Sequence, residues 1–228
     1  MKRNTMPIVA AALVCPLLAA AASASAPERG WRLRVNGYWM DVGEGQVSPS
    51  NTEYRSRVEN GAAAGGGAAV EYRLGPRLGI ELGLFGGANN DYTVAFDAGA
   101  IAVTNTMEFH AGCVGLNFHL TPSTKLDFYA GPFVALVTYD ALVGVANAPP
   151  GSTGFPGSVS VNFDSEMTLG ANIGVDVPIS QRHWIFNATV KYLATNPDTT
   201  LEWIGVDSRR ASASIDPLAV GVGFGYRF

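Results

Sequence analysis

Apolar and small residues alternate strictly along the C-terminal segment of the chain. The apolar set is Leu218, Val220, Val222, Phe224, Tyr226 and Phe228, and Ala219, Gly221, Gly223, Gly225 and Arg227 lie between them. Successive side chains of a β-strand point to opposite faces, so this period of two predicts a strand. One face of that strand is apolar and the other is nearly bare, which is unusual for a sheet that faces water.

The same alternation, interrupted by clusters of Gly, Pro and Asn, predicts eight strands in the whole chain. They cover residues 31–41, 67–74, 78–87, 106–120, 125–139, 166–177, 184–195 and the terminal segment 215–228. Short turns join the second strand to the third, the fourth to the fifth and the sixth to the seventh. The other connections are long, among them a predicted loop over about 88–105.

Long and short connections that alternate between an even number of strands are typical of outer-membrane barrels. Strands of about 10 residues cross the hydrocarbon when tilted, and closure of the sheet removes the open edges that lipid does not tolerate. We therefore predict an all-β fold, an eight-stranded antiparallel transmembrane β-barrel. Its termini are expected in the periplasm and its four long loops outside the cell.

A soluble barrel of the lipocalin type would place its apolar face inside. When the face that carries Phe228 is taken as outward and followed from strand to strand, nearly all strand charges fall on the inward face. An interior with many charges suits a membrane barrel and does not suit a lipocalin cavity. Val222→Arg should then cost about 2–4 kcal/mol of stability, and Gly221→Ser far less.

The N-terminus indicates export. Lys2 and Arg3 precede an apolar run from Ile8 to Ala22, and Ala24-Ser25-Ala26 follows, which is the pattern of a cleavable signal peptide over residues 1–26. The barrel domain is then residues 27–228. Its net charge is negative, and this argues against a nucleic-acid partner, because nucleic acids are themselves negatively charged. Cys113 is the cysteine that follows the signal, so an intrachain disulfide is excluded.

Four motifs resemble the OmpW family of small outer-membrane barrels. They are GVDVPISQRHW at 174–184, YAGPF at 129–133, IDP at 215–217 and the closing GYRF at 225–228. The chain departs from the family pattern at 110–113, where the family has Pro-Pro-Thr, and at Glu166-Met167, where an aromatic residue is frequent. The resemblance implies a monomeric, narrow barrel in the outer membrane of a Gram-negative bacterium that passes small hydrophobic molecules, with exit through its wall. It also implies that the assembly machinery reads the strand that ends in Phe228.

Height along the strands divides the inward residues into two sets. The lower, periplasmic set is charged and should form a closed ionic plug, since an unpaired buried charge is costly; it consists of Arg32, Arg34, Glu71, Arg73, Glu81, Lys125, Asp127, Asp176 and Arg227. The upper set is apolar and is the candidate ligand-binding site: Met40, Phe85, Phe109, Phe133, Val137 and Leu193. In so narrow a barrel these side chains could instead pack together and leave no cavity.

The sequence offers little for catalysis. A Ser nucleophile needs a His base within hydrogen-bond reach. His119 and His183 fall at the periplasmic turns, and His110 points outward with no His-x-Ser motif around it. We expect no enzyme activity, no catalytic residues, no metal site and no cofactor.

Two functions remain. The first is a channel or carrier for small hydrophobic molecules, surrounded by lipid and lipopolysaccharide. The second is a structural, adhesive or receptor barrel that acts through its outer loops. The lumen separates them, because a carrier needs an apolar pocket and an adhesin can fill its interior with a closed polar network.

Overall fold

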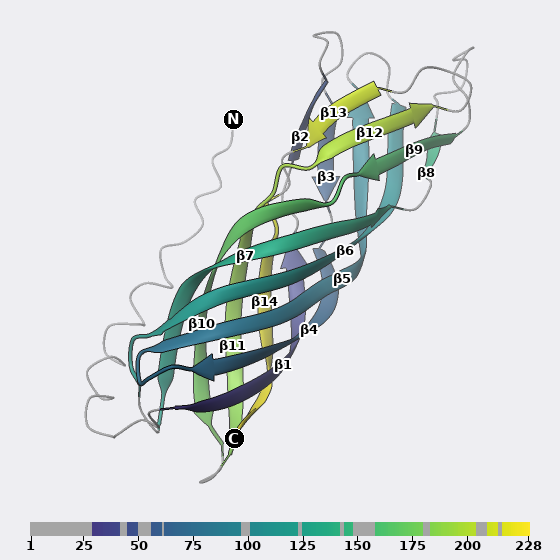
Figure 1. Ribbon diagram of the computed structural model, residues 1–228. Helices are drawn as coiled ribbons and strands as arrows, with labels where there is room; N and C mark the ends of the chain where they lie inside the picture. The colour runs from purple at the N-terminus through teal and green to yellow at the C-terminus, as the bar shows by residue number, and fades with distance from the viewer. Residues whose placement is uncertain are drawn as a thin grey trace, which may run out of the picture.

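Eight long strands close into one antiparallel barrel in the computed structural model (Figure 1), as the alternation predicted. They are β1 (Gly30–Asp41), β4 (Ala62–Arg73), β5 (Leu78–Phe96), β6 (Ile101–His119), β7 (Asp127–Ala141), β10 (Glu166–Pro178), β11 (Trp184–Ala194) and β14 (Leu218–Arg227). Around the barrel the order is β1-β14-β11-β10-β7-β6-β5-β4, and β4 pairs with β1 to close the ring.

The structure describes residues 29–41, 45–49, 56–60, 62–96, 101–122, 125–141, 144–147, 158–179, 183–203, 209–213 and 216–228. The predicted signal peptide, residues 1–26, lies outside these ranges. Within them, no helix is long and apolar enough to cross a membrane.

Both ends of the barrel domain lie at the end of the barrel that carries the short turns. The Phe228 amide donates to the Trp31 carbonyl over 3.0 Å, so the last residue is held beside the first strand. The turns are closed by backbone bonds such as Leu120 N to Phe128 O at 2.8 Å and Ile179 N to Trp184 O at 3.0 Å. We call this end the turn end and the opposite end the loop end.

Short strands continue the wall at the loop end, away from the C-terminus (Figure 1). They are β2 (Gly45–Pro49), β3 (Ser56–Asn60), β8 (Gly144–Asn147), β9 (Ser158–Phe163), β12 (Asp198–Trp203) and β13 (Arg209–Ala213). They pair in the order β8-β9-β12-β13-β2-β3, and β5 and β6 close this second ring. The barrel wall therefore continues beyond the main barrel as a second ring of paired strands.

This extension corrects several predicted boundaries. Most of the predicted loop over 88–105 is strand, because β5 runs to Phe96 and β6 starts at Ile101. The strand predicted from residue 67 begins at Ala62, and the strand predicted from Lys125 begins at Asp127. Backbone pairing requires only a neighbouring strand with free amide and carbonyl groups, so stretches of Gly and polar residues joined the sheet without side-chain alternation.

The bare face of β14 lies inside the barrel, where its glycines leave room for neighbouring side chains. A Cβ atom on Gly225 would lie 2.8 Å from Ile185 Cδ1, and one on Gly221 would overlap the ring of Tyr38. Such a close approach is what a narrow lumen demands. It also argues against the expectation that Gly221→Ser costs far less than Val222→Arg, because even the first side-chain carbon at this position meets the ring of Tyr38.

Candidate functional site: the barrel lumen

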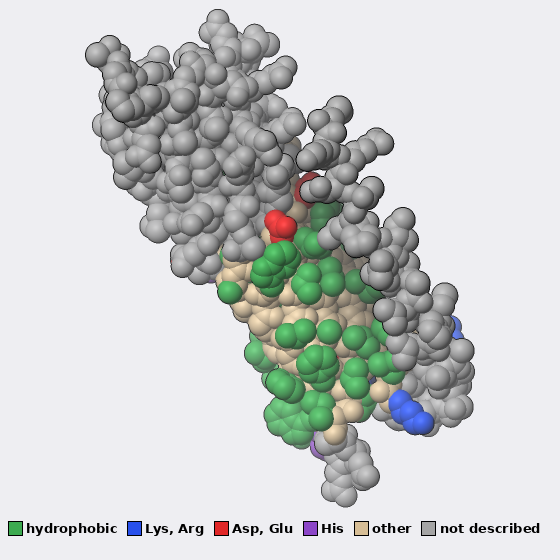
Figure 2. Space-filling model, turned by 180° about the vertical axis from the view of Figure 1, so that it is seen from behind, with side chains coloured by type: hydrophobic (Ala, Val, Ile, Leu, Met, Phe, Trp, Pro, Cys, Tyr) green, Lys and Arg blue, Asp and Glu red, His purple; other side chains and the backbone are tan. Residues whose placement is uncertain are grey.

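Burial follows the predicted parity on all eight long strands. Most charged residues of the inward set are buried, whereas the apolar residues of the outward set are exposed or partly exposed, for example Leu84 at 69% and Val222 at 56%. Figure 2 shows this outer surface from one side: hydrophobic side chains cover its middle, and the charged ones lie towards its two ends. An apolar outer band with a charged interior is the arrangement of a membrane barrel.

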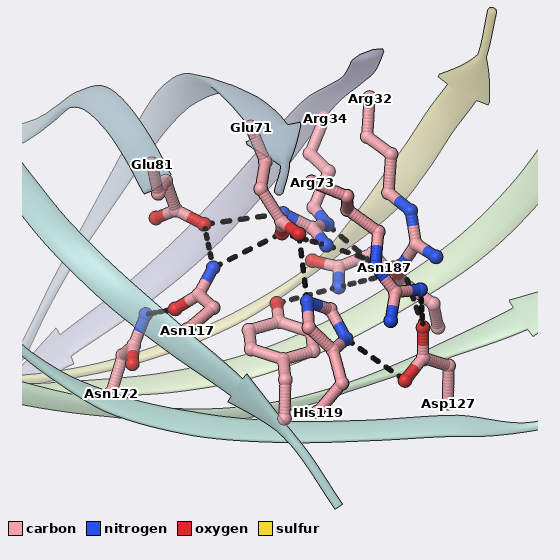
Figure 3. Close-up of polar contacts among 12 residues, drawn as sticks. Arg32, Arg34, Glu71, Arg73, Glu81, Asn117, His119, Asp127, Asn172 and Asn187 are labelled. Carbon is pink, nitrogen blue, oxygen red and sulfur yellow. Dashed lines mark hydrogen bonds and ion pairs between the residues drawn. The ribbon is translucent and has the colours of Figure 1, made fainter. Parts of the chain in front are cut away.

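The buried charges of the turn end form one network across the lumen (Figure 3). Arg34 is at its centre: its Nε and Nη2 atoms donate to the two carboxylate oxygens of Asp176 over 3.1 and 2.8 Å. The same guanidinium lies 2.7 Å from Glu71 and 3.1 Å from Glu81. Three carboxylates from β4, β5 and β10 thus converge on one side chain of β1, and such pairing is the condition for burying charge.

Arg32 and Arg73 complete the network nearer the turns. Arg32 Nη1 lies 2.8 Å from Asp127 and 2.7 Å from Asp176. Arg73 Nη1 lies 3.0 Å from the same oxygen of Asp127, and its Nη2 donates to the Pro76 carbonyl in the turn between β4 and β5. The cations and carboxylates alternate in space, so the predicted plug residues of these strands do come together.

His119 joins two of the carboxylates. Its Nε2 atom lies 2.7 Å from Glu71 Oε1 and its Nδ1 atom lies 2.9 Å from Asp127 Oδ1, with the ring fully buried. The two ring nitrogens thus contact carboxylates from two different strands, β4 and β7. His119 therefore bridges Glu71 and Asp127 within the plug.

Amide side chains fill the remaining positions of the network. Asn117 donates to Glu71 over 3.1 Å and to Glu81 over 2.9 Å, and its own oxygen accepts from Asn172 at 3.0 Å. Asn187 donates to Asp176 and to the Tyr129 hydroxyl, each over 2.9 Å. Asn172 and Tyr129 were not assigned to either lumen set from the sequence, although the inward parity of their strands contains both.

The structure places Lys191, and not Lys125, in the plug. Lys125 was placed in the plug, but its side chain is exposed, because it lies in the turn before β7 begins. Lys191, which was assigned to neither lumen set from the sequence, lies 2.8 Å from Glu81 and is 4% exposed. Its ammonium group also lies 5.6 Å from the ring centre of Phe85 and 5.4 Å from that of Phe133. It therefore forms the boundary between the plug and the apolar layer above.

The apolar residues of the upper set do meet in one layer. All of them are buried, and Met40, Phe109 and Val137 are fully buried; the set is Met40, Phe85, Phe109, Phe133, Val137 and Leu193. Phe85 contacts Phe109 and Phe133 edge to face, with ring centres 6.0 and 6.4 Å apart. Tyr38 lies against the same ring at 5.8 Å. The aromatic side chains therefore contact one another in the described lumen.

Beside this layer the wall loses its backbone pairing. The ladder between β7 and β10 ends at Val137 and Glu166, and pairing of the following segments resumes at Gly144 and Val159. No ladder pair joins β7 beyond Val137 to β9 among the described residues. A side chain spans this interval instead: the Tyr139 hydroxyl donates to Glu166 over 3.0 Å. We call it the wall interval.

The sequence profile of the OmpW family matches residues 39–228. Among curated proteins no relative matches the chain. The structure of the outer membrane protein OprG from Pseudomonas aeruginosa is similar, with a TM-score of 0.66 and 15% identity over 91% of this chain and 99% of OprG. The outer membrane protein AlkL, solved in lipid bilayers, has a TM-score of 0.59 and 16% identity over 90% of this chain and 93% of AlkL.

The two structures share the fold with this chain, and at these identities they establish nothing more. The family match covers most of the barrel and agrees with the motifs that were read from the sequence, including the closing GYRF. The family match places the chain among the barrel proteins of the outer membrane of Gram-negative bacteria. The chain belongs to the OmpW family and is one of its eight-stranded outer-membrane β-barrels.

Proposed function

We propose that this barrel is a carrier for small hydrophobic molecules, which bind in the apolar layer and leave through the wall. The observation that carries the proposal is the position of that layer. It lies directly above a closed ionic network and directly beside the wall interval. A hydrophobic solute cannot enter the charged half of the lumen at low cost, because the solute would separate ion pairs there without offering polar groups to replace them.

In this proposal the turn end faces the periplasm and the loop end faces the outside. A solute enters at the loop end and separates the side chains of the layer, and unbranched Met40 adapts to it at small cost. The plug prevents passage straight through the lumen. The solute then leaves through the wall interval, between the part of β7 beyond Val137 and β9, where contacts of the Tyr139 side chain with Glu166 and Phe163 stand in place of a ladder.

The proposal includes the surroundings of the barrel. The outward apolar band contacts the lipid and lipopolysaccharide of the outer membrane, and the protein acts as a monomer. The strand that ends in Phe228 is recognised by the outer-membrane assembly machinery. The alternative, an adhesive or structural barrel, would have no use for an apolar layer in its lumen.

The binding test uses the protein in lipid nanodiscs with isotopically labelled methionine methyl groups, titrated with toluene. Met40 is fully buried in the apolar layer, whereas Met167 is 75% exposed on the outer face and reports the partition of toluene into lipid. The Met40 methyl resonance should shift to saturation, while that of Met167 changes without saturation. Met40 behaviour that matches that of Met167 would rule out the binding site.

The matched variants are Phe133→Arg and Val134→Ala. Phe133 points into the layer and is 3% exposed, and its chain neighbour Val134 points outward and is 42% exposed. The first substitution should abolish saturation and the second should retain it. In intact cells, entry of the fluorescent apolar probe phenylnaphthylamine should fall to the level of cells without the protein for Phe133→Arg alone. Unchanged entry with this variant would favour the adhesive alternative.

A further inference from the structure

The buried charges of the described lumen balance, apart from His119. The buried cations are Arg32, Arg34, Arg73 and Lys191, and the buried carboxylates are Glu71, Glu81, Asp127 and Asp176. Every one of these carboxylates lies within 3.1 Å of at least one of these cations. Any additional cation would therefore have to share a carboxylate that is already engaged, as Asp127 and Asp176 are with two arginines each.

Arg227 is such an additional cation. It lies at the end of β14 on the inward face, and its Cα is the ladder partner of Arg32, which is itself engaged with Asp127 and Asp176. No carboxylate of the described residues forms an ion pair with Arg227. Its Nε and Nη2 atoms are buried, and neither has a hydrogen-bond partner in the part of the chain that the structure describes.

These two nitrogens form one edge of the guanidinium group. The barrel shows what this edge binds, because Arg34 uses the same pair of atoms to hold both oxygens of Asp176. Two parallel N–H donors match the two oxygens of a carboxylate or a phosphate, and such charge-assisted pairs are about twice as strong as neutral hydrogen bonds. A buried donor edge without an acceptor is costly, so it marks a place for a ligand.

We propose that Arg227 binds a small oxyanion, a carboxylate or a phosphate group, at the turn end of the lumen. The anion accepts hydrogen bonds from Nε and Nη2 of Arg227, the two buried donors that have no acceptor among the described residues. This site is separate from the apolar layer and does not depend on the carrier function.

The position of Arg227 suits a ligand that arrives from the aqueous side of the turn end. The residue is half-buried rather than fully enclosed, and it is next to the last residue of the chain. Its carbonyl oxygen lies 2.8 Å from Nδ1 of His183, an exposed residue of the turn between β10 and β11. This contact involves the backbone of Arg227 and leaves Nε and Nη2 of its side chain without an acceptor among the described residues. Arg73 Nε is a second buried donor without a described partner in the same half of the lumen.

The experiment follows the Nε–H resonances of nitrogen-labelled arginine in the full barrel, in maltoside micelles at low ionic strength. Inorganic phosphate and acetate are titrated separately, with chloride as the control for screening. The Arg227 resonance should move to saturation with phosphate or acetate and not with chloride. The Arg34 resonance should stay in place, because its edge is filled by Asp176.

Phospholipid nanodiscs distinguish the source of the anion. If the Arg227 resonance in nanodiscs already matches the phosphate-saturated position, a lipid headgroup supplies the oxyanion; if it moves only on titration, a free anion does. Both results support the site. A change that chloride reproduces at equal ionic strength overturns it, since that result shows an adventitious ion only.

The variants Arg227→Gln and Lys125→Gln complete the test. Both remove one cation at the turn end, but Lys125 is exposed. Arg227→Gln should weaken phosphate binding by about tenfold or more, as expected for the loss of a charge-assisted hydrogen bond. This loss is read from the amide resonances of the turn end, and Lys125→Gln should retain the wild-type affinity. Equal affinities of the two variants would show that Arg227 is not the site.

Discussion

Replacing Arg34 with Met should destabilise the barrel more than the loss of any exposed cation. The side chain is 1% exposed and contacts Glu71, Glu81 and Asp176. Breaking a buried ion pair by removing one partner costs about 3–5 kcal/mol. Each of the three carboxylates keeps another partner, namely His119, Lys191 and Arg32 respectively. We therefore expect the lower end of the range, about 3 kcal/mol.

The assay is reversible guanidinium unfolding of the barrel in lipid vesicles, followed by tryptophan fluorescence. Lys125→Met is the matched control and should change the free energy of unfolding by less than about 0.5 kcal/mol, as is usual for exposed positions. The double variant Arg34→Met/Asp176→Asn should lose less than the sum of the two single losses, because it removes both members of one pair. Equal stability of Arg34→Met and Lys125→Met would refute the closed network.

Three further outcomes test the parity and the packing of β14. Val222→Arg places a charge on the lipid face and should cost about 2–4 kcal/mol in the same unfolding assay; a neutral effect would contradict the outward direction of Val222. Gly221→Ala should also destabilise the barrel, by about 1–3 kcal/mol, because its Cβ overlaps the ring of Tyr38; combining it with Tyr38→Ala should recover much of the loss. Deletion of Phe228 should impair assembly far more than Arg227→Ala, measured as heat-modifiable migration of membrane fractions, and equal assembly of the two would count against a role for the terminal aromatic residue.

The plug and the apolar layer meet at Lys191, which has a practical consequence for mutagenesis. Its ammonium group pairs with Glu81 on one side and lies over two phenylalanine rings on the other. A change at this position would alter both halves of the lumen at once. A variant that probes the layer alone should therefore be made at Met40, because Phe133 itself contacts Lys191.

The sequence by itself determined the class of the fold and the direction of the side chains. Alternation with a period of two is a local property of an extended chain, so it can be read without knowledge of any partner strand. The alternation placed Val222 outside and Arg34 inside. The turn residues between the strands indicated how many strands there are and how they are connected. The resemblance in motifs such as GYRF at 225–228 led to the family for the same reason, since each motif is contiguous.

The tertiary structure alone decided which inward residues meet. Arg32 and Asp176 are 144 positions apart and come within 2.7 Å because closure and stagger of the barrel bring β1 and β10 to the same height. The position along the barrel axis also decided which lysine joins the network. Lys191 lies at the level of Glu81 and pairs with it, whereas Lys125 lies in a turn. The sequence pattern also did not predict the strand ends beyond the alternating segments, such as Ala88 to Phe96. These ends are fixed by backbone pairing with neighbouring strands. Parity is local, whereas pairing across a lumen depends on the register of every strand in the ring.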